Sequence, residues 1–233
     1  MKYILKFDRI RSAELVEQTE ADNLVEYYSA ILSNQSLADL SKFVNLMLAL
    51  GVHRSHWCDA TSSLTNWTGF FHPIATVIGA HFVRGAEWWV RRRLVNESMA
   101  FHFDKDEHSF EKSGKMTTPW RSTVLYLSSS GGPTIVTNQS VDGSSQIVPT
   151  VPTRVVLVEC ELNRLLSFPG KFSHAVAGIE GTGMRTTLIV NWWKDRPMGL
   201  VETPSFADFP RISAANFRRV VPHALEGRLF EEA

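Results

Sequence analysis

The sequence predicts a mainly β fold, a barrel or sandwich core with supporting N-terminal helices, and two patterns lead to this prediction. From residue 87 to residue 193, short segments rich in aromatic and β-branched residues alternate with Gly and Pro, which is typical of short strands joined by turns. Between residues 12 and 51, apolar residues recur at helical spacing instead. With 233 residues, 44% of them hydrophobic, the chain can bury a core in one large domain.

The first 97 residues are expected to support that core. Residues 2–7 alternate apolar and polar side chains as a short edge strand does, and residues 12–32 carry the apolar stripe of an amphipathic helix. A second helix is predicted to begin near Ser36 and to end at Gly51, because serine caps helices and glycine terminates them. Pro73 suits the first turn of a third helix.

His53, His56 and Cys58 lie at a spacing that resembles a metal site. A closed zinc site needs four ligands, and no second cluster of His or Cys supplies the rest. A polar junction between a helix and a loop is therefore the simpler interpretation of this segment.

Strands are predicted around Trp88 to Val90 and over residues 98–103, with a turn near Asn96 between them. Three consecutive arginines, Arg91 to Arg93, lie in this region. They suit either a nucleic-acid patch or a solvated strand edge, and the absence of interleaved aromatic residues favours the edge.

Further strands and loops complete the chain. Six more strands are predicted at residues 122–127, 134–137, 154–161, 164–168, 173–179 and 186–193. Residues 105–118 and 137–152 are polar and rich in turn formers, so we expect loops there that cover a binding site. Four prolines after Trp193 predict a surface wrap, with one short helix near residues 214–220.

Composition limits the partners and the compartment. Lys plus Arg and Asp plus Glu both number 24, so no basic excess points to nucleic acid or to an anionic membrane. Only Cys58 and Cys160 are cysteines, which predicts a reducing compartment. Charges come early at the N-terminus and no apolar run approaches the length of a membrane span. We expect a cytoplasmic or other reducing intracellular protein without membrane contact.

His102 and Asp104 form the motif His-x-Asp in a predicted strand. Residues i and i+2 of a strand point to the same side, so both side chains can reach one metal ion while Phe103 faces away. Two imidazoles and one carboxylate fill one face of an octahedral Fe(II) and leave three positions open. His174, which opens a later strand, is the best candidate for the third ligand.

Arg185 lies eleven residues beyond His174 and opens the apolar run that ends at Trp193. A guanidinium presents two parallel N–H groups and therefore suits a carboxylate that must be held in one orientation. This pairing suggests a dicarboxylate co-substrate.

The ordered set resembles the 2-oxoglutarate/Fe(II)-dependent dioxygenase superfamily, and its prolyl-4-hydroxylase-like branch in particular. The set consists of His-x-Asp, a His 70 residues after Asp104 and an Arg soon after it, with Gly131-Gly132 placed before a strand. The resemblance covers about residues 98–194 and implies a double-stranded β-helix, also called a jelly roll. Residues 1–97 would then be the supporting segment of a single domain, and residues 195–233 a C-terminal wrap.

The resemblance also implies cofactors and roles. His102, Asp104 and His174 would bind Fe(II), and Arg185 would bind the distal carboxylate of 2-oxoglutarate with help from Tyr126 and Thr187. The expected reaction uses O2, with ascorbate as a possible reductant, and hydroxylates an unidentified protein side chain or small metabolite while succinate and CO2 are released. His102, Asp104, His174 and Arg185 are the expected catalytic set.

Two branches of the family fit less well, and one alternative function stays open. Asp104 occupies the position where related halogenases carry a small residue, which favours oxygen insertion. Nucleic-acid demethylases of the family carry a second Arg six residues after the first, where this chain has Asn191. The alternative is a metal-binding jelly-roll module without catalysis, which acts as a sensor or an interaction domain.

Overall fold

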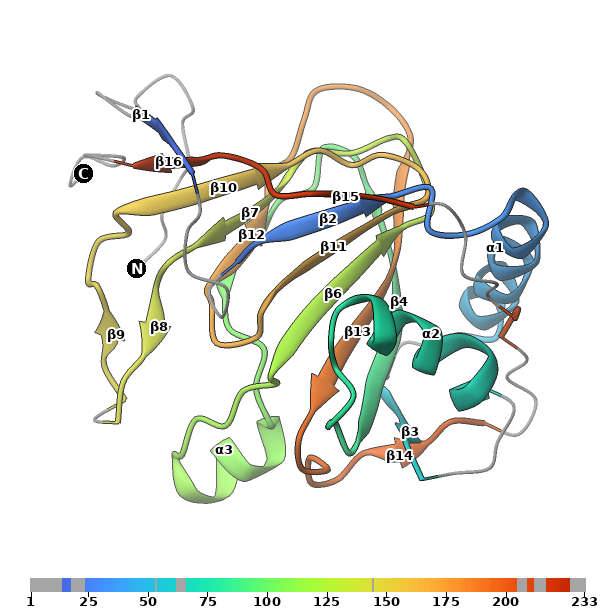
Figure 1. Cartoon of the computed structure of the whole chain (residues 1–233), viewed down its shortest axis with the longest axis horizontal. Helices are drawn as coiled ribbons and strands as arrows, with labels where there is room; N and C mark the ends of the chain where they lie inside the picture. The colour runs from blue at the N-terminus through green and yellow to red at the C-terminus, as the bar shows by residue number, and fades with distance from the viewer. Residues whose placement is uncertain are drawn as a thin grey trace.

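A computed structural model describes residues 14–17, 24–52, 54–61, 66–143, 145–204, 209–211 and 217–226. Apart from one small hairpin, its strands form two large sheets, which Figure 1 shows as two layers. The smaller sheet has the order β1 (Glu14–Val16), β16 (Ala224–Glu226), β10 (Arg154–Val158), β7 (Thr134–Thr137), β12 (His174–Val176) and β5 (Met99–His102).

The larger sheet has eight strands. Their order is β14 (Val201–Glu202), β3 (His56–Asp59), β4 (Gly85–Leu94), β13 (Met184–Trp193), β6 (Arg121–Tyr126), β11 (Arg164–Pro169), β2 (Glu26–Ser29) and β15 (Arg218–Val220). All neighbours pair antiparallel except β14 and β3, which run parallel.

These sheets contain a double-stranded β-helix. Four neighbouring strands of the larger sheet, β4, β13, β6 and β11, form one half of it. Four neighbouring strands of the smaller sheet, β5, β12, β7 and β10, form the other half. This confirms the predicted mainly β jelly roll. The division at residues 97 and 194 stays a prediction, and β4, from the segment expected to give support, pairs along its whole length with β13.

The core has two main parts, one on each face of the larger sheet. Val124, Leu166 and Phe168 pack between the sheets against residues of the smaller sheet such as Val136 and Val156. The other face of the larger sheet is covered by α1 (Asn34–Ala49), the π-helical turn η3 (Trp67–Phe71) and α2 (His72–Val77), which bury Trp88, Leu188 and Trp192. The supporting helices predicted near Ser36 and Pro73 are thus confirmed, with Ser33 as the cap of α1.

Three element predictions were wrong in part. The helix predicted over residues 12–32 is replaced, where the structure describes it, by β1 and β2, because β2 gains a full ladder of hydrogen bonds with β11. The loop over residues 105–118 contains α3 (Glu107–Ser113), capped by Asp106 and ended by Gly114. The stretch 137–152 forms a small hairpin of β8 (Ser140–Val141) and β9 (Ile147–Val148).

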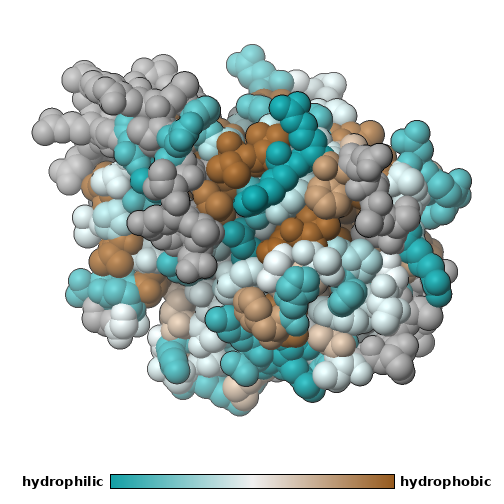
Figure 2. Space-filling view, viewed as in Figure 1, coloured by the Kyte–Doolittle hydropathy of each residue, from teal (hydrophilic) through white to brown (hydrophobic). Residues whose placement is uncertain are grey.

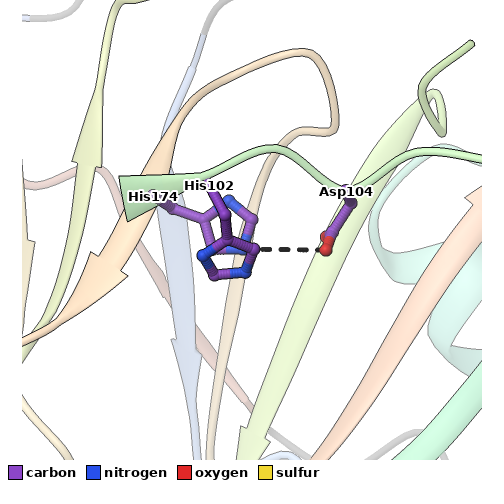
Figure 3. Close-up of side chains that lie close together, drawn as sticks. All are labelled: His102, Asp104 and His174. Carbon is purple, nitrogen blue, oxygen red and sulfur yellow. Dashed lines mark ion pairs between the residues drawn. The ribbon is translucent and has the colours of Figure 1, made fainter. Parts of the chain in front are cut away.

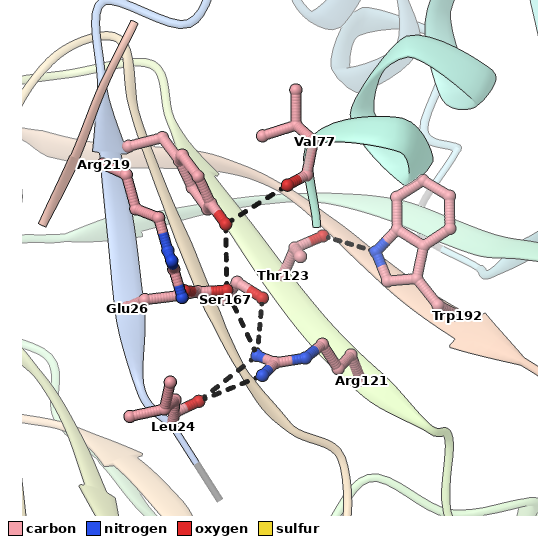
Figure 4. A network of polar contacts seen from close by, with 9 residues as sticks. Leu24, Glu26, Val77, Arg121, Thr123, Ser167, Trp192 and Arg219 are labelled. Carbon is pink, nitrogen blue, oxygen red and sulfur yellow. Dashed lines mark hydrogen bonds and ion pairs between the residues drawn. The ribbon is translucent and has the colours of Figure 1, made fainter. Parts of the chain in front are cut away.

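The C-terminal tail contributes strands instead of the predicted helix. Residues 218–220 form β15, and residues 214–216, which that helix also included, lie outside the described residues, as do residues 2–7. A polar network fastens β15 to the larger sheet (Figure 4). The buried carboxylate of Glu26 accepts hydrogen bonds from Tyr28 (2.9 Å) and Arg219 (2.6 Å) and pairs with Arg121 (3.7 Å).

The outer surface is mixed in character. Figure 2 shows hydrophobic residues gathered toward the middle of the viewed face, with hydrophilic residues among and around them. None of the helices in the described part of the chain combines the length and the apolar character needed to cross a bilayer.

Candidate metal centre

The three predicted metal ligands meet at one end of the smaller sheet (Figure 3). His102 ends β5 and is the direct cross-strand partner of His174, which opens β12, so their rings lie 4.2 Å apart. Asp104 lies two residues beyond the end of β5, with its Oδ1 3.8 Å from His174 Nε2. One ligand atom from each residue lies within 4.8 Å of the other two, which is the arrangement that a single metal ion requires.

Hydrogen bonds hold the three ligands in place. The Nδ1 atoms of His102 and His174 lie 2.9 Å and 3.2 Å from the carbonyl oxygens of Ala100 and Phe172. A carbonyl only accepts, so each ring donates from Nδ1 and keeps the lone pair of Nε2 for a metal. Ser122, on β6, donates to Asp104 Oδ2 at 2.6 Å and leaves Oδ1 available.

His174 is held in the form that binds metals. Its burial lowers its pKa, and the positive charge that His102 can carry acts in the same direction, while Asp104 opposes the shift. The ring of Phe168 lies 4.8 Å from the imidazole and contributes to this burial. A neutral imidazole, as required of a metal ligand, is therefore favoured near neutral pH.

The ligands face a cavity of about 460 Å³ between the sheets. Val124, Phe168 and Ile189 form apolar parts of its wall. Phe103, expected to face away from the metal, also borders the cavity. A volume of this size lies in the range of small-molecule sites.

Arg185 lies at this cavity on β13 and is only 7% exposed. Its Nη2 donates to Thr134 Oγ1 at 2.9 Å, while its Nε has no hydrogen-bond partner among the described residues. The buried hydroxyl of Thr187, two residues along the same strand face, also lacks one. Buried polar atoms are rarely left unpaired in proteins, so a donor pair of this kind facing a cavity points to a ligand with acceptor oxygens.

The backbone at Gly131 makes room for the Arg185 side chain. Its φ is +127°, and a Cβ at this position would lie 2.6 Å from Arg185 Cδ. Any other residue would be strained there and would displace the guanidinium. The first glycine of the pair Gly131-Gly132, a landmark in the sequence, thus leaves the space that the Arg185 side chain occupies.

Tyr126 does not border the cavity but contacts two residues that do, Thr134 and Arg185. Its hydroxyl is 2.7 Å from Thr134 Oγ1, and its ring lies 5.2 Å from the Arg185 guanidinium. Burial raises its pKa to about 12, so it stays a neutral phenol. The predicted contact between Tyr126 and a co-substrate stays a prediction, while its contact with the Thr134 hydroxyl that binds Arg185 is direct.

Sequence reasoning missed the roles of Ser122 and Thr134. Both lie on predicted strands, but only the strand pairing shows that they face the metal ligands and Arg185. The other suggested metal cluster does not form a site in the described residues: His56 is buried in β3 with Nδ1 3.3 Å from the carbonyl oxygen of Glu202, and Cys58 is a free, buried thiol. His53 lies outside the described residues.

No protein-family model matches the chain, and its sequence matches no curated protein. Solved structures do match its fold. A prolyl-4-hydroxylase from Pseudomonas putida is 14% identical, with a TM-score of 0.50 over 75% of this chain and 89% of that one. The non-heme alpha ketoglutarate dependent epimerase SnoN from nogalamycin biosynthesis is 12% identical, with a TM-score of 0.52 over 83% and 90%.

A third similar structure is the non-heme alpha ketoglutarate dependent carbocyclase SnoK from nogalamycin biosynthesis. It is 10% identical, with a TM-score of 0.52 over 86% of this chain and 93% of that one. At these identities the likeness shows the fold. The chain therefore has the jelly roll found in these proteins.

Proposed function

We propose that this chain belongs to the 2-oxoglutarate/Fe(II)-dependent oxygenase superfamily and is an active enzyme of that class. The observation that carries the proposal is one cavity that joins a group of two histidines and an aspartate to a buried arginine with an unpaired donor. The fold shared with enzymes of this kind adds support. Either half of the site alone would be weaker evidence, because single buried histidines and arginines are common in cores.

The residues present fit an iron ion. His102 and His174 offer neutral nitrogen donors and Asp104 offers one anionic oxygen, which is the donor set of non-heme Fe(II) sites with open positions. Ser122 donates a hydrogen bond to Asp104, and the two imidazoles donate to the carbonyls of Ala100 and Phe172. These three bonds orient the donors even when no metal is bound.

The residues also fit 2-oxoglutarate. Arg185 has a free Nε donor and Thr187 has a free hydroxyl, both buried at the cavity, and a carboxylate placed between them would satisfy both. Together, bound Fe(II), 2-oxoglutarate and O2 supply oxidative decarboxylation to succinate and CO2, coupled to oxidation of a substrate.

The protein's own contribution is orientation and exclusion of water. Val124, Phe168 and Ile189 border the cavity with apolar surface, so a carboxylate beside Arg185 loses its hydration and is bound more strongly than it would be in water. Thr134 holds one end of the guanidinium, and the buried phenol of Tyr126 holds Thr134. These residues act as positioning groups.

Hydroxylation of a protein side chain or a small metabolite is the reaction we favour. The carboxylate of Asp104 supports hydroxylation, since the related halogenases carry a small residue at that position. The similar structures include a hydroxylase, an epimerase and a carbocyclase, so the product must be determined on this chain itself. A reducing intracellular compartment agrees with two cysteines that are both free and buried.

The test is formation of succinate from 2-oxoglutarate in the presence of Fe(II), O2 and ascorbate, without added substrate. Enzymes of this class turn over slowly in that uncoupled way, so wild type should produce succinate above an Asp104→Ala control. A metal-binding module without catalysis would give equal, background succinate in both proteins. Mass spectrometry of candidate substrates for a gain of one oxygen atom then separates hydroxylation from other outcomes.

A further inference from the structure

A second group of arginines faces the same cavity from the neighbouring strand. Glu87, Trp89, Arg91 and Arg93 occupy alternate positions of β4 and all border the cavity. Alternate residues of a strand share one face, so β4 presents an acid, an aromatic ring and two guanidiniums in a row. The two arginines lie toward the C-terminal end of that row.

The register of β4 and β13 brings Arg91, Arg93 and Arg185 together. Arg93 is the direct cross-strand partner of Arg185, and Arg91 is the partner of Thr187. Like charges at such positions destabilise a sheet. In the described part of the chain, no hydrogen bond or ion pair joins Arg91 or Arg93 to a protein group. Arg91 is exposed at the cavity rim and Arg93 is half-buried, and desolvation together with the charge of Arg93 lowers the pKa of Arg91.

The charges around the cavity do not balance. Its lining contains five cationic side chains: Arg54, Arg91, Arg93, Lys105 and Arg185. The described part of that lining contains only three acids, of which Asp104 is a proposed metal ligand and Glu107 already pairs with Lys105 at 2.9 Å. The third, Glu87, accepts a hydrogen bond from Trp193 at 2.9 Å, and its burial raises its pKa.

The proposed cofactors do not remove this excess. Fe(II) brings two positive charges and 2-oxoglutarate two negative ones, and the distal carboxylate of the latter is assigned to Arg185 and Thr187. Among the described residues, the guanidiniums of Arg91 and Arg93 therefore still lack a partner when Fe(II) and 2-oxoglutarate are both bound. This step rests on the proposed function.

Arg92 shows that the arrangement is specific to one face of β4. Its side chain lies on the opposite face, where it donates to Thr186 Oγ1 at 3.1 Å and to Asn45 Oδ1 at 2.5 Å. The predicted solvated strand edge agrees with the exposure of Arg91 and Arg92 and with the pairing of β3, which ends at Trp88. The sequence did not show that Arg91 and Arg93 border the cavity. Only the central arginine has protein partners in the described structure.

We infer that the substrate of this site is a small molecule with an oxyanion group, a carboxylate or a phosphate, which Arg91 and Arg93 bind. Guanidiniums suit both groups, because their paired N–H donors match two oxygens at once. Trp89, half-buried beside Arg91 on the same face, offers a flat apolar surface to the rest of the molecule. The anion would anchor one end of the substrate and leave the other end free to reach the metal.

The test measures binding and needs no turnover. Protein loaded with Mn(II) in place of iron and saturated with 2-oxoglutarate is titrated by calorimetry under anaerobic conditions with phenyl phosphate, phenylacetate and neutral benzyl alcohol. The two anions should bind more tightly than the alcohol, and their ranking identifies the preferred oxyanion. Arg91→Gln/Arg93→Gln should weaken anion binding by on the order of tenfold or more for each guanidinium. The alcohol should be unaffected.

Arg92→Gln is the matched control, because it removes the same charge from the same strand on the opposite face. It should keep wild-type affinity for both anions. The inference is overturned if the double variant binds the anions as tightly as wild type does. If the double variant does not fold, the same comparison is made with each single variant. Anion binding that disappears once 2-oxoglutarate is saturating also overturns the inference, since the anion then occupies the Arg185 site. Failure of 2-oxoglutarate itself to bind the Mn(II) protein would instead refute the proposed function.

Discussion

Arg185 is the residue on which the choice of co-substrate depends. Replacing it with Leu leaves His102, Asp104 and His174 untouched but removes the proposed partner of the distal carboxylate of 2-oxoglutarate. Loss of a buried charge partner costs about 3–5 kcal/mol, which corresponds to on the order of a hundred- to a few thousand-fold in affinity. We therefore expect a large rise in the apparent Michaelis constant for 2-oxoglutarate, with metal content unchanged.

Two further variants sharpen this prediction. Arg185→Lys should recover only part of the affinity, because an ammonium lacks the paired donors of a guanidinium. Arg92→Leu, which removes a cation from the opposite face of the neighbouring strand, should leave the Michaelis constant near that of wild type. If Arg185→Leu and wild type had the same Michaelis constant, the main ground for naming 2-oxoglutarate would disappear.

At the residue scale, the sequence predicted the cluster of His102, Asp104 and His174 better than the residues around it. The i, i+2 spacing placed His102 and Asp104 on one side, although β5 ends at His102 and Asp104 lies just beyond it. The pairing of His174 with His102 depends on the contact between β12 and β5, which no local pattern contains. Ser122 and Thr134 were missed for the same reason, since strand order decides which hydroxyls face the site.

At the element scale, strand β2 shows why local patterns can mislead. The apolar spacing across residues 12–32 fits a helix, yet Glu26 and Tyr28 are both buried on β2. Hydrogen bonding with β11 and β15 on either side outweighs helix propensity there. Glu26 is tolerated inside only because Arg219, Arg121 and Tyr28 surround its carboxylate.

Glu26→Gln should therefore destabilise the attachment of β15. The amide accepts fewer hydrogen bonds and removes the negative charge that pairs with the buried Arg121. We expect the free energy of unfolding to fall by about 1–3 kcal/mol. Urea denaturation followed by circular dichroism measures this, with the slope against urea expected to stay constant.

The control for that measurement is a carboxylate with an exposed ion pair. Glu202 pairs with Arg196, and their side chains are 61% and 39% exposed, so Glu202→Gln should cost about 0–1 kcal/mol. An equal loss of stability in the two variants would mean that the network around Glu26 contributes no more than a surface pair.

At the scale of the whole molecule, the jelly roll places residues that are far apart in the chain at one cavity. The strand segments were predictable from β-branched and aromatic runs, but their arrangement was predictable only through the resemblance of the ordered motif. The alternation of strands between the two sheets brings β5, β12, β13 and β4 around one space. The proposed metal ligands come from β12, from β5 and from the segment just after β5, and the arginines come from β13 and β4.

Our central claim is that the two histidines, the aspartate and Arg185 form a single site for metal and 2-oxoglutarate. Anaerobic calorimetry of 2-oxoglutarate with and without Mn(II), in wild type and in His174→Ala, tests it most directly. In wild type, 2-oxoglutarate should bind much more tightly when Mn(II) is present, because the metal and Arg185 hold opposite ends of it. His174→Ala should lose Mn(II) and with it this enhancement. Metal-independent binding in wild type, or unchanged enhancement in His174→Ala, would contradict the claim.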